Sequence, residues 1–574
     1  PSMMAASPGG ALVAVVNSHS DSVSLIDAKS LNVTTVAIPA WPEKTLGSQP
    51  SAVAFAPSGD RLYVACGGTN AVVVLGRAAG RWTVQGAVPT GWFPSAIALD
   101  ASGALRVLNI KGLGKTTRAK GGFNSRSFEG SLRKIAPPTA PQLAAGLREV
   151  RAANEPRFDP AGGVETLSSL GVKHVVLIIK ENRTYDQVFG DIAKGNGDPK
   201  LVMYGRDVTP NHHALAEQYV LLDNFYTGGA ISFDGHQWLM QSFVSDYVER
   251  AFSASPRGYA WNMADALTVS PAGFFWQSAT RPLDIRIYGE FCLPARWNPQ
   301  TRSVVDMNED DDLPWRQYWA LYQTGQWPSE VGCQPGVPAL RPQMSLRYPY
   351  SSMAITDQIR ADEFLRELAE REKSGAMPHI SILTLNQDHT EGKRPDYPTP
   401  RAMVADNDLA LGRIVEGLSK SRFWPNTLVL VVEDDAQDGV DHVDGRRTVA
   451  LAVGPYVRRG VVDSNYYTHT SMIRTIQDIF EIPARTRYLK SARAMTSVFQ
   501  PDAAPAPYQA LAPKVALDEM NPPVKALSGR ALWAARQSMA MNFKEIDDVP
   551  RDVLNRILWW DAKGWDTPYP VKSK

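Results

Sequence analysis

The chain has 574 residues, and its 60 basic and 59 acidic side chains give a formal net charge of +1. Chains of this length fold as roughly two to four domains. Hydrophobic residues make up 44% and charged residues 21% of the sequence, which excludes a largely disordered protein. The balanced charge argues against a nucleic-acid binder, and no apolar run approaches the roughly 18–20 residues that a membrane helix needs.

Residues 1–115 differ in composition from the rest of the chain. Short apolar runs alternate there with Gly, Asn, Asp and Ser, a pattern typical of antiparallel strands joined by tight turns. The runs predicted as strands are 11–17, 22–26, 52–56, 61–65, 71–75, 95–99 and 104–110.

An internal repeat organises this segment. Residues 49–64 recur as residues 93–107, at an offset of 44 that matches the roughly 40–45 residues of a four-stranded propeller blade. The repeat resembles the YncE/YVTN-type β-propeller. Only about two and a half blades are present and a closed ring needs at least about four, so we expect an incomplete antiparallel domain that is covered on at least one edge. A small β-domain of another kind is the alternative. The expected role of the blades is docking, of a protein partner or of substrate.

The pattern changes beyond this segment. Residues 116–170 are rich in Arg, Ala and Pro and are predicted to form a linker with a helix at 141–153. From 171 to 500, apolar strands alternate with amphipathic helices, which is typical of a doubly wound α/β domain. The predicted strands are 175–179, 285–288, 380–385 and 428–432, and the predicted helices are 361–373, 403–418 and 471–480.

Two further segments complete the expected organisation. An insertion at about 251–345 separates the first core helix from the next one. The tail, 501–574, contains a predicted helix at 529–541 and a Trp-rich run at 557–560, and we expect it to pack back onto the core.

Ligand-type side chains follow three of the predicted strands. They are the pairs Glu181 and Asn182, Asp388 and His389, and Asp434 and Asp435, with His442 beyond the last pair. In an open parallel sheet, ligands bind at the carboxyl ends of the strands. Acids gathered there are costly unless a cation neutralises them, so the pattern predicts a metal site, although any single pair would also fit solvated loop acids. Oxygen and imidazole ligands without a thiolate suit Ca²⁺, Mg²⁺, Mn²⁺, or a mixed Zn²⁺ or Fe site.

Ser232 is the candidate nucleophile. It follows the turn-forming pair Gly228-Gly229 and precedes a helix-compatible run, 237–250. A hydroxyl at a helix N-terminus lies where backbone N–H groups favour an anion, but serine is also a common N-cap.

These residues carry a resemblance. Residues 180–190, KENRTYDQVFG, resemble the ENR-[ST]-[FY]-D signature of the phosphoesterase family of phospholipases C and acid phosphatases, in the alkaline-phosphatase-like superfamily. The resemblance covers roughly 172–500. It implies an α/β alkaline-phosphatase-like core and a phosphoric ester hydrolase acting through a phosphoseryl intermediate, on a small phosphate ester or a phospholipid headgroup. It also implies one to three divalent metal ions and a bacterial protein that is periplasmic or secreted.

The resemblance also implies residue roles. Ser232 is the expected nucleophile. The expected metal ligands are Glu181, Asn182, Asp388, His389, Asp434, Asp435 and His442. The expected substrate-binding residues are Asn182, Arg183, His236 and His469. His389 departs from the superfamily pattern, because two-zinc members place a histidine a few residues beyond the equivalent of Asp388.

Two alternatives remain at this point. Residues 292–296 read C-x-P-x-R, similar to the formylglycine-forming motif of sulfatases, and would make Cys292 the nucleophile. That motif lies 111 residues after Glu181, whereas Ser232 lies 51 residues after it and already takes the nucleophile's place. Cys292 could instead pair with Cys333, or all three cysteines could be unpaired. The other alternative is a catalytically dead binding protein that uses the blades.

Overall fold

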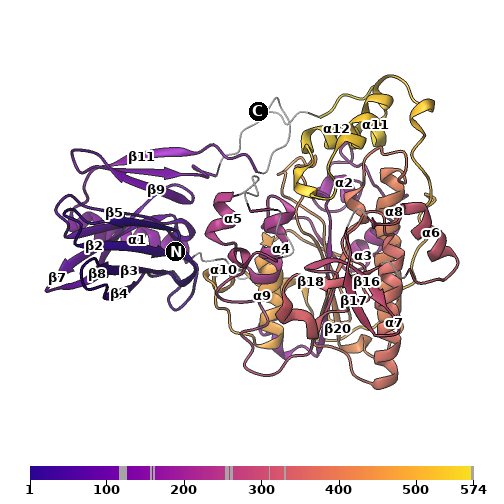
Figure 1. Ribbon diagram of the computed structural model, residues 1–574. Helices are drawn as coiled ribbons and strands as arrows, with labels where there is room; N and C mark the ends of the chain where they lie inside the picture. The colour runs from indigo at the N-terminus through magenta and orange to yellow at the C-terminus, as the bar shows by residue number, and fades with distance from the viewer. Residues whose placement is uncertain are drawn as a thin grey trace.

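The computed structural model describes residues 1–114, 126–155, 158, 162–251, 257–258, 263–308, 311–328 and 331–570. Two parts are visible, a set of antiparallel sheets built by the N-terminal segment and a larger α/β body (Figure 1). No helix in the described ranges is long and apolar enough to cross a membrane.

The N-terminal part consists of three antiparallel sheets. The first contains β1 (Met3–Ala6), β2 (Leu12–Asn17), β3 (Ser22–Asp27) and β4 (Val33–Ala37). The second contains β5 (Pro50–Phe55), β6 (Arg61–Cys66), β7 (Ala71–Ala78) and β8 (Arg81–Pro89). The third contains β9 (Pro94–Leu99), β10 (Leu105–Asn109) and β11 (Ser131–Ile135). Every run predicted as a strand overlaps one of these, whereas β1, β4, β8 and β11 were not predicted.

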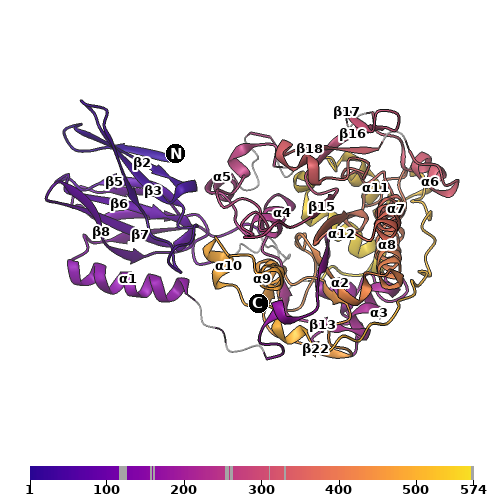
Figure 2. The ribbon, with the colours of Figure 1, turned by 90° about the horizontal axis from the view of Figure 1, so that it is seen from below.

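Within the described residues the three sheets do not close into a ring. The range expected to be a linker contributes to them at two places. β11 pairs with β10, and the predicted helix is α1 (Ala140–Asn154), which packs against the edge strand β8. Figure 2 shows α1 alongside the sheet that contains β8. The third sheet therefore extends beyond the expected boundary at residue 115.

Two glycines allow α1 to approach β8 closely. A Cβ at Gly146 of α1 would lie 2.2 Å from the carbonyl oxygen of Ala87, and a Cβ at Gly86 would lie 2.6 Å from the carbonyl oxygen of Leu143. Both distances are far below van der Waals contact, so the backbones can meet only where no side chain intervenes.

The body is built on a five-stranded sheet in the order β15-β19-β12-β20-β21. The central strands are β12 (His174–Lys180), β19 (Ile380–Leu385) and β20 (Thr427–Glu433), flanked by β15 (Ile285–Tyr288) and by the antiparallel β21 (Ala450–Val453). β12, β19 and β20 are parallel and almost completely buried, which explains why they read as continuous apolar runs. The predicted α/β core with an N-terminal antiparallel domain is confirmed.

Helices cover both sides of this sheet (Figures 1 and 2). α7 (Asp357–Ser374) and α8 (Pro400–Lys420) pack together on one side, and α9 (His469–Phe480) lies on the other. The remaining helices of the body are α2 (Tyr185–Phe189), α3 (Pro210–Gln218), α4 (Ser232–Gln241), α5 (Asp246–Ala251), α6 (Trp315–Gln323) and α10 (Arg487–Ser491). Short strand pairs join β13 (Val220–Leu222) to β22 (Val461–Asp463) and β14 (Phe225–Tyr226) to β23 (Tyr467–Thr468).

The insertion contains a small sheet of β16 (Cys292–Asn298), β17 (Ser303–Asp306) and β18 (Gly332–Pro335). Cys292 and Cys333 form a disulfide between β16 and β18, while Cys66 is a buried free thiol. The tail supplies α11 (Gly529–Ala540) and α12 (Arg551–Lys563), which pack on the body near α2 and α8, in yellow in Figure 1.

The close contact between α1 and β8 can be tested by substitution. Gly146→Val should destabilise the folded protein by about 1–3 kcal/mol, because the added side chain would overlap the Ala87 carbonyl. Ala145→Val is the matched control, since Ala145 is exposed on the same helix and the change costs only about 0.5 kcal/mol of helix propensity. Thermal denaturation measures both. Equal effects of the two variants would contradict the packing described here.

Candidate active site

The carboxyl ends of β12 and β20 bring four candidate ligands together. Lys180 pairs in register with Glu433, so the residues that follow, Glu181 with Asn182 and Asp434 with Asp435, leave the sheet at the same edge. All four residues are buried, with exposed fractions between 0% and 4%. The register of two parallel strands thus creates a dense acidic site.

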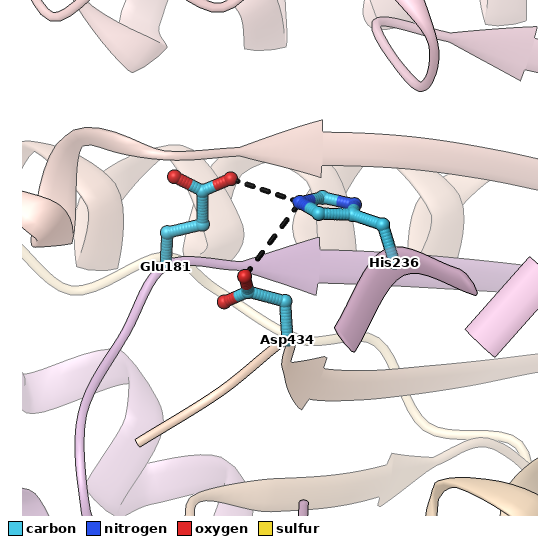
Figure 3. Close-up of side chains that lie close together, drawn as sticks. All are labelled: Glu181, His236 and Asp434. Atoms are coloured by element: carbon cyan, nitrogen blue, oxygen red, sulfur yellow. Dashed lines mark hydrogen bonds and ion pairs between the residues drawn. The ribbon is translucent and has the colours of Figure 1, made fainter. Parts of the chain in front are cut away.

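His236, on α4, joins this edge (Figure 3). Its Nε2 lies 3.0 Å from Oε1 of Glu181 and 3.6 Å from Oδ2 of Asp434. Its Nδ1 lies 3.0 Å from a carboxylate oxygen of Glu290. Glu181, His236 and Asp434 offer ligand atoms close enough together to hold one cation. A carboxylate behind the imidazole is the arrangement that orients metal-binding histidines.

Ser232 begins α4 and lies beside the second carboxylate. Its Oγ donates to Oδ2 of Asp435 at 3.4 Å and accepts from Nδ2 of Asn182 at 3.4 Å. The same Asn182 amide donates to Oδ1 of Asp435 at 2.9 Å. The hydroxyl is 1% exposed. The site therefore has a buried hydroxyl held between an amide donor and a carboxylate acceptor.

Several oxygens at this edge lack protein hydrogen-bond partners. Among the described residues, both carboxylate oxygens of Asp434, Oε2 of Glu181 and Oδ1 of Asn182 accept no hydrogen bond. Buried polar atoms are normally paired, and hard oxygen donors of this kind suit a divalent cation. The donor set, with one imidazole and no thiolate, fits the metal that the sequence predicts.

The shifted pKa values of the site residues also indicate a cation site. Burial, together with the charges of Asp435 and Glu181, raises the pKa of Asp434 well above its usual range. Burial also raises the pKa of Glu181 and of Asp435, although His236 and Arg551 oppose this. Burial would lower the pKa of His236, but Glu290, Glu181 and Asp434 outweigh it and raise that pKa well above its usual value. The acids are thus held together at an electrostatic cost that a cation would relieve.

Asp388 and His389 lie at the end of β19 but engage other partners. Asp388 forms an ion pair with Lys180 at 2.8 Å and accepts hydrogen bonds from the Glu181 backbone and from Asn407. His389 bonds the Thr390 carbonyl and Gln437, and burial lowers its pKa to about 3. Neither belongs to the group of atoms around Asp434 that could hold a cation.

His442 and Arg183 are also directed elsewhere. His442 is 33% exposed at its side chain and contacts Asp186 at 2.6 Å, in a separate cluster with Asp441. The guanidinium of Arg183 donates to the backbone carbonyls of Asn182, Asp388 and His389 and to Gln437. The structure therefore separates these two residues from the ligands near Asp434.

His469 begins α9 beside the site. Its Nε2 bonds the Glu433 carbonyl at 2.9 Å, one residue before Asp434, and burial lowers its pKa to about 3. Its Nδ1 has no hydrogen-bond partner among the described residues.

Two residues of the site were not predicted from the sequence. Glu290 follows β15, a fourth strand of the same sheet, so the rule applied to the other strand ends would have pointed to it. Arg551 of α12 donates from Nη2 to Oδ2 of Asp435 at 2.8 Å, and its side chain is 1% exposed. No local sequence signal marks Arg551.

Residues 172–483, more than half of the chain, match the Phosphoesterase family. The chain belongs to this family. Membership in a phosphoesterase family indicates an ester hydrolase. No curated protein matches the chain.

Three solved structures resemble parts of the chain. An alkaline phosphatase superfamily protein from Vibrio parahaemolyticus is 17% identical over 60% of this chain and 76% of its own, with a TM-score of 0.35. Hydrazine synthase of Kuenenia stuttgartiensis is 28% identical over 19% of this chain, with a TM-score of 0.16. A putative 6-phosphogluconolactonase from Bacteroides fragilis is 18% identical over 19%, with a TM-score of 0.17. The chain spans 28% and 31% of the length of these last two proteins.

The raised pKa of Asp434 yields a test on chelator-treated protein. Because this pKa is higher in the folded than in the unfolded state, ionisation of Asp434 favours unfolding. The cost is absent well below the unfolded pKa of about 4, where both states are protonated, and it grows as the pH rises above that value. Asp434→Asn should therefore stabilise the chelated protein at pH 7 by about 1–3 kcal/mol, with a smaller gain near pH 4.

Calorimetry at both pH values measures this effect, and elemental analysis should show a lower metal content for Asp434→Asn in the untreated protein. Asp444→Asn is the control, because Asp444 is exposed and its change should stay within about 0.5 kcal/mol. Destabilisation by Asp434→Asn at both pH values would contradict the electrostatic reasoning.

Proposed function

We propose that the protein is a divalent-metal-dependent phosphoric ester hydrolase, of the phospholipase C or acid phosphatase type, that acts through a phosphoseryl intermediate on Ser232. The observation that carries the proposal is the position of Ser232 Oγ, 3.4 Å from both Asp435 and Asn182. Asp435 directly follows Asp434, whose carboxylate oxygens accept no hydrogen bond among the described residues. A hydroxyl nucleophile next to a cation site is the arrangement that covalent phosphoryl transfer needs.

Glu181, His236 and Asp434 are the residues that would hold a cation, with Asn182 and Asp435 beside them. When bound, a divalent cation would supply positive charge that stabilises the transition state and makes the hydroxyl easier to ionise. The oxygen-rich donors favour Ca²⁺, Mg²⁺ or Mn²⁺, and one imidazole also admits Zn²⁺ or Fe.

The protein groups support the following steps. Ser232 Oγ attacks phosphorus and its proton passes to Asp435, whose raised pKa makes it a better base. The bond from phosphorus to the ester oxygen breaks, and that oxygen takes a proton from water as it leaves. The hydroxide that this water leaves behind then attacks phosphorus, the bond to Oγ breaks, and Oγ takes its proton back from Asp435. Asn182 Nδ2, which donates to Ser232 Oγ, would donate to an oxygen of the phosphoryl group.

A sulfate ester is the second candidate substrate class, since a sulfuryl group is tetrahedral like a phosphoryl group and the same donors would suit its oxygens. The version of this hypothesis that uses Cys292 loses support, because Cys292 is bonded to Cys333 and offers no thiol for oxidation to an aldehyde. The unpaired buried oxygens of Asp434 and Glu181 likewise speak against a catalytically dead scaffold.

Two wider proposals accompany this function. A disulfide persists in oxidising compartments, so the Cys292–Cys333 bond supports a periplasmic or secreted location.

A cavity of about 450 Å³ lies between the N-terminal sheets and the body, lined by aromatic side chains that include Trp92, Phe93 and Trp238. Aromatic linings of this kind favour binding, which supports a docking role for the sheets.

Ser232→Ala should reduce hydrolysis of p-nitrophenyl phosphate or of its diester by several orders of magnitude while leaving metal content unchanged, because the remaining groups retain only part of the rate enhancement. Quenching the parent protein during turnover should leave a phosphoryl group on the peptide that contains Ser232, detectable by mass spectrometry. Exhaustive chelation should also remove the activity.

Ser471→Ala is the matched control, because Ser471 is a buried hydroxyl in the first turn of the neighbouring helix α9 and caps its N-terminus. It should cost about 1 kcal/mol of stability without loss of turnover. Near-normal turnover in Ser232→Ala would mean that water attacks phosphorus directly. Faster turnover of p-nitrophenyl sulfate than of either phosphate would favour the sulfate ester.

The double variant Cys292→Ser/Cys333→Ser tests whether the cysteines of the sulfatase-like motif act in catalysis or only stabilise the fold. It should retain the parent turnover number, because neither sulfur lies among the site atoms, but lose about 2–5 kcal/mol of stability with the disulfide. Activity assays below the melting temperature and thermal denaturation measure the two effects. Complete loss of turnover in a folded double variant would return Cys292 to the list of candidate nucleophiles.

A further inference from the structure

A carboxylate side chain from the tail of the chain is hydrogen-bonded to the N-terminus of α4. The backbone N–H groups of Ser232 and Phe233 donate to the two carboxylate oxygens of Asp547, at 3.1 and 2.8 Å. Asp547 lies in a short 3-10 turn, Ile546–Asp548, just before α12, and its side chain is 8% exposed. A carboxylate therefore sits on the first turn of the helix that begins with the candidate nucleophile.

Arg551 connects this carboxylate to the catalytic edge. Its Nη2 donates to Oδ1 of Asp547 at 2.6 Å and to Oδ2 of Asp435 at 2.8 Å, and its Nη1 donates to the Ala230 carbonyl at 3.1 Å. The same Asp435 oxygen accepts from Ser232 Oγ. The hydroxyl, two backbone N–H groups and one buried guanidinium thus converge within a few hydrogen bonds of one another.

This set of donors has the chemistry of a site for a tetrahedral oxyanion. Two N–H groups at a helix N-terminus and a guanidinium are the groups that bind phosphate oxygens most effectively. A phosphoryl group attacked by Ser232 must lie against Oγ, and its oxygens then come within reach of these donors. Asp547 presents two oxygens to the same donors, as a phosphoryl group would.

We propose that Asp547 occupies the place of the substrate's phosphoryl oxygens, and that Arg551 is the residue that binds those oxygens when Asp547 is displaced. The segment 541–551 is then a built-in competitor of the phosphoryl group. The inference rests on the proposed function, because it takes Ser232 as the nucleophile. It adds a binding residue and an intramolecular inhibitor from outside the range that matches the family.

Competition between Asp547 and a phosphoryl ligand determines how much the segment weakens phosphate binding. If Asp547 holds the site in about 90% of the molecules, the apparent affinity for a phosphoryl ligand is about 10-fold weaker than the intrinsic affinity. Loss of Asp547 from the site should remove that factor. Loss of Arg551 should weaken phosphate binding, because Arg551 is the guanidinium that donates to both Asp435 and Asp547.

The test uses the full-length protein with its metal content measured, and inorganic phosphate as the probe. In calorimetric titrations, Asp547→Asn should lower the dissociation constant of phosphate about 10-fold, with a matching fall in KM for an aryl phosphate. Asp547→Ser provides a second variant if the amide still caps the helix. Arg551→Ala should raise the dissociation constant at least 10-fold, and Arg551→Lys less. Asp548→Asn is the control. Asp548 is exposed and its carboxylate accepts a hydrogen bond from Asn542 at 3.4 Å, so the variant's affinity for phosphate should equal the parent's.

A measurement on the unmodified protein completes the test. Saturating phosphate should displace the segment, so amide hydrogen exchange over residues 544–550 should increase in the phosphate-bound parent. The inference is overturned if exchange there is unchanged, if both Asp547 variants fold and bind phosphate no tighter than the parent, or if Arg551→Ala binds phosphate as the parent does. Failure of the proposed function gives a different result: phosphate binding would respond to these variants while no ester is hydrolysed.

Discussion

The mutual repulsion of buried carboxylates at the ends of β12 and β20 is the constraint on which the rest of the site depends. The parallel register of these strands places Glu181 and Asp434 side by side, and Asp435 follows directly. Positive groups arrive from other parts of the chain: His236 from α4 and Arg551 from α12. Even so, both oxygens of Asp434 stay without a hydrogen-bond partner in the described protein. The site therefore has more negative than positive groups. Burial, together with this imbalance, raises the pKa of Asp434, and the same imbalance fits a divalent cation.

Much of this edge could be predicted because its signals are local. β12, β19 and β20 are fully buried, so they stand out as apolar runs, and the polar residues after them are marked by position alone. β8 and β11 were missed because their exposed residues break the apolar pattern. Asp388 shows the limit of the rule: it ends a core strand as expected, but Lys180 on the adjacent strand neutralises it. Strand order and side-chain direction determine which strand-end acid pairs with a lysine. Neither can be predicted from the residues around that acid in the sequence.

The roles of Arg551 and Asp547 could not be predicted from the sequence, and the cause differs from that for Asp388. Each is a single charged residue in a polar tail, and each acts through contacts with residues more than a hundred positions earlier, Asp435 and Ser232. Packing of α12 against α8 and against residues 201–208 determines where they lie, and that packing follows from apolar residues such as Leu554 and Leu558 rather than from any motif. A site described only by the family segment would therefore omit the guanidinium that touches its acids.

The contact between Arg551 and Asp435 has a consequence for how the protein is made. Synthesis proceeds from the N-terminus, so the ribosome completes the acidic edge well before it adds α12. In that interval Asp435 has the Asn182 amide but no guanidinium, and a buried carboxylate without a charged partner weighs against folding. The nascent core should then remain loosely folded, and open to chaperones and to a cation from solution, until more than a hundred further residues have emerged. The order of residues along the chain thus sets the order in which the charges of the site become balanced.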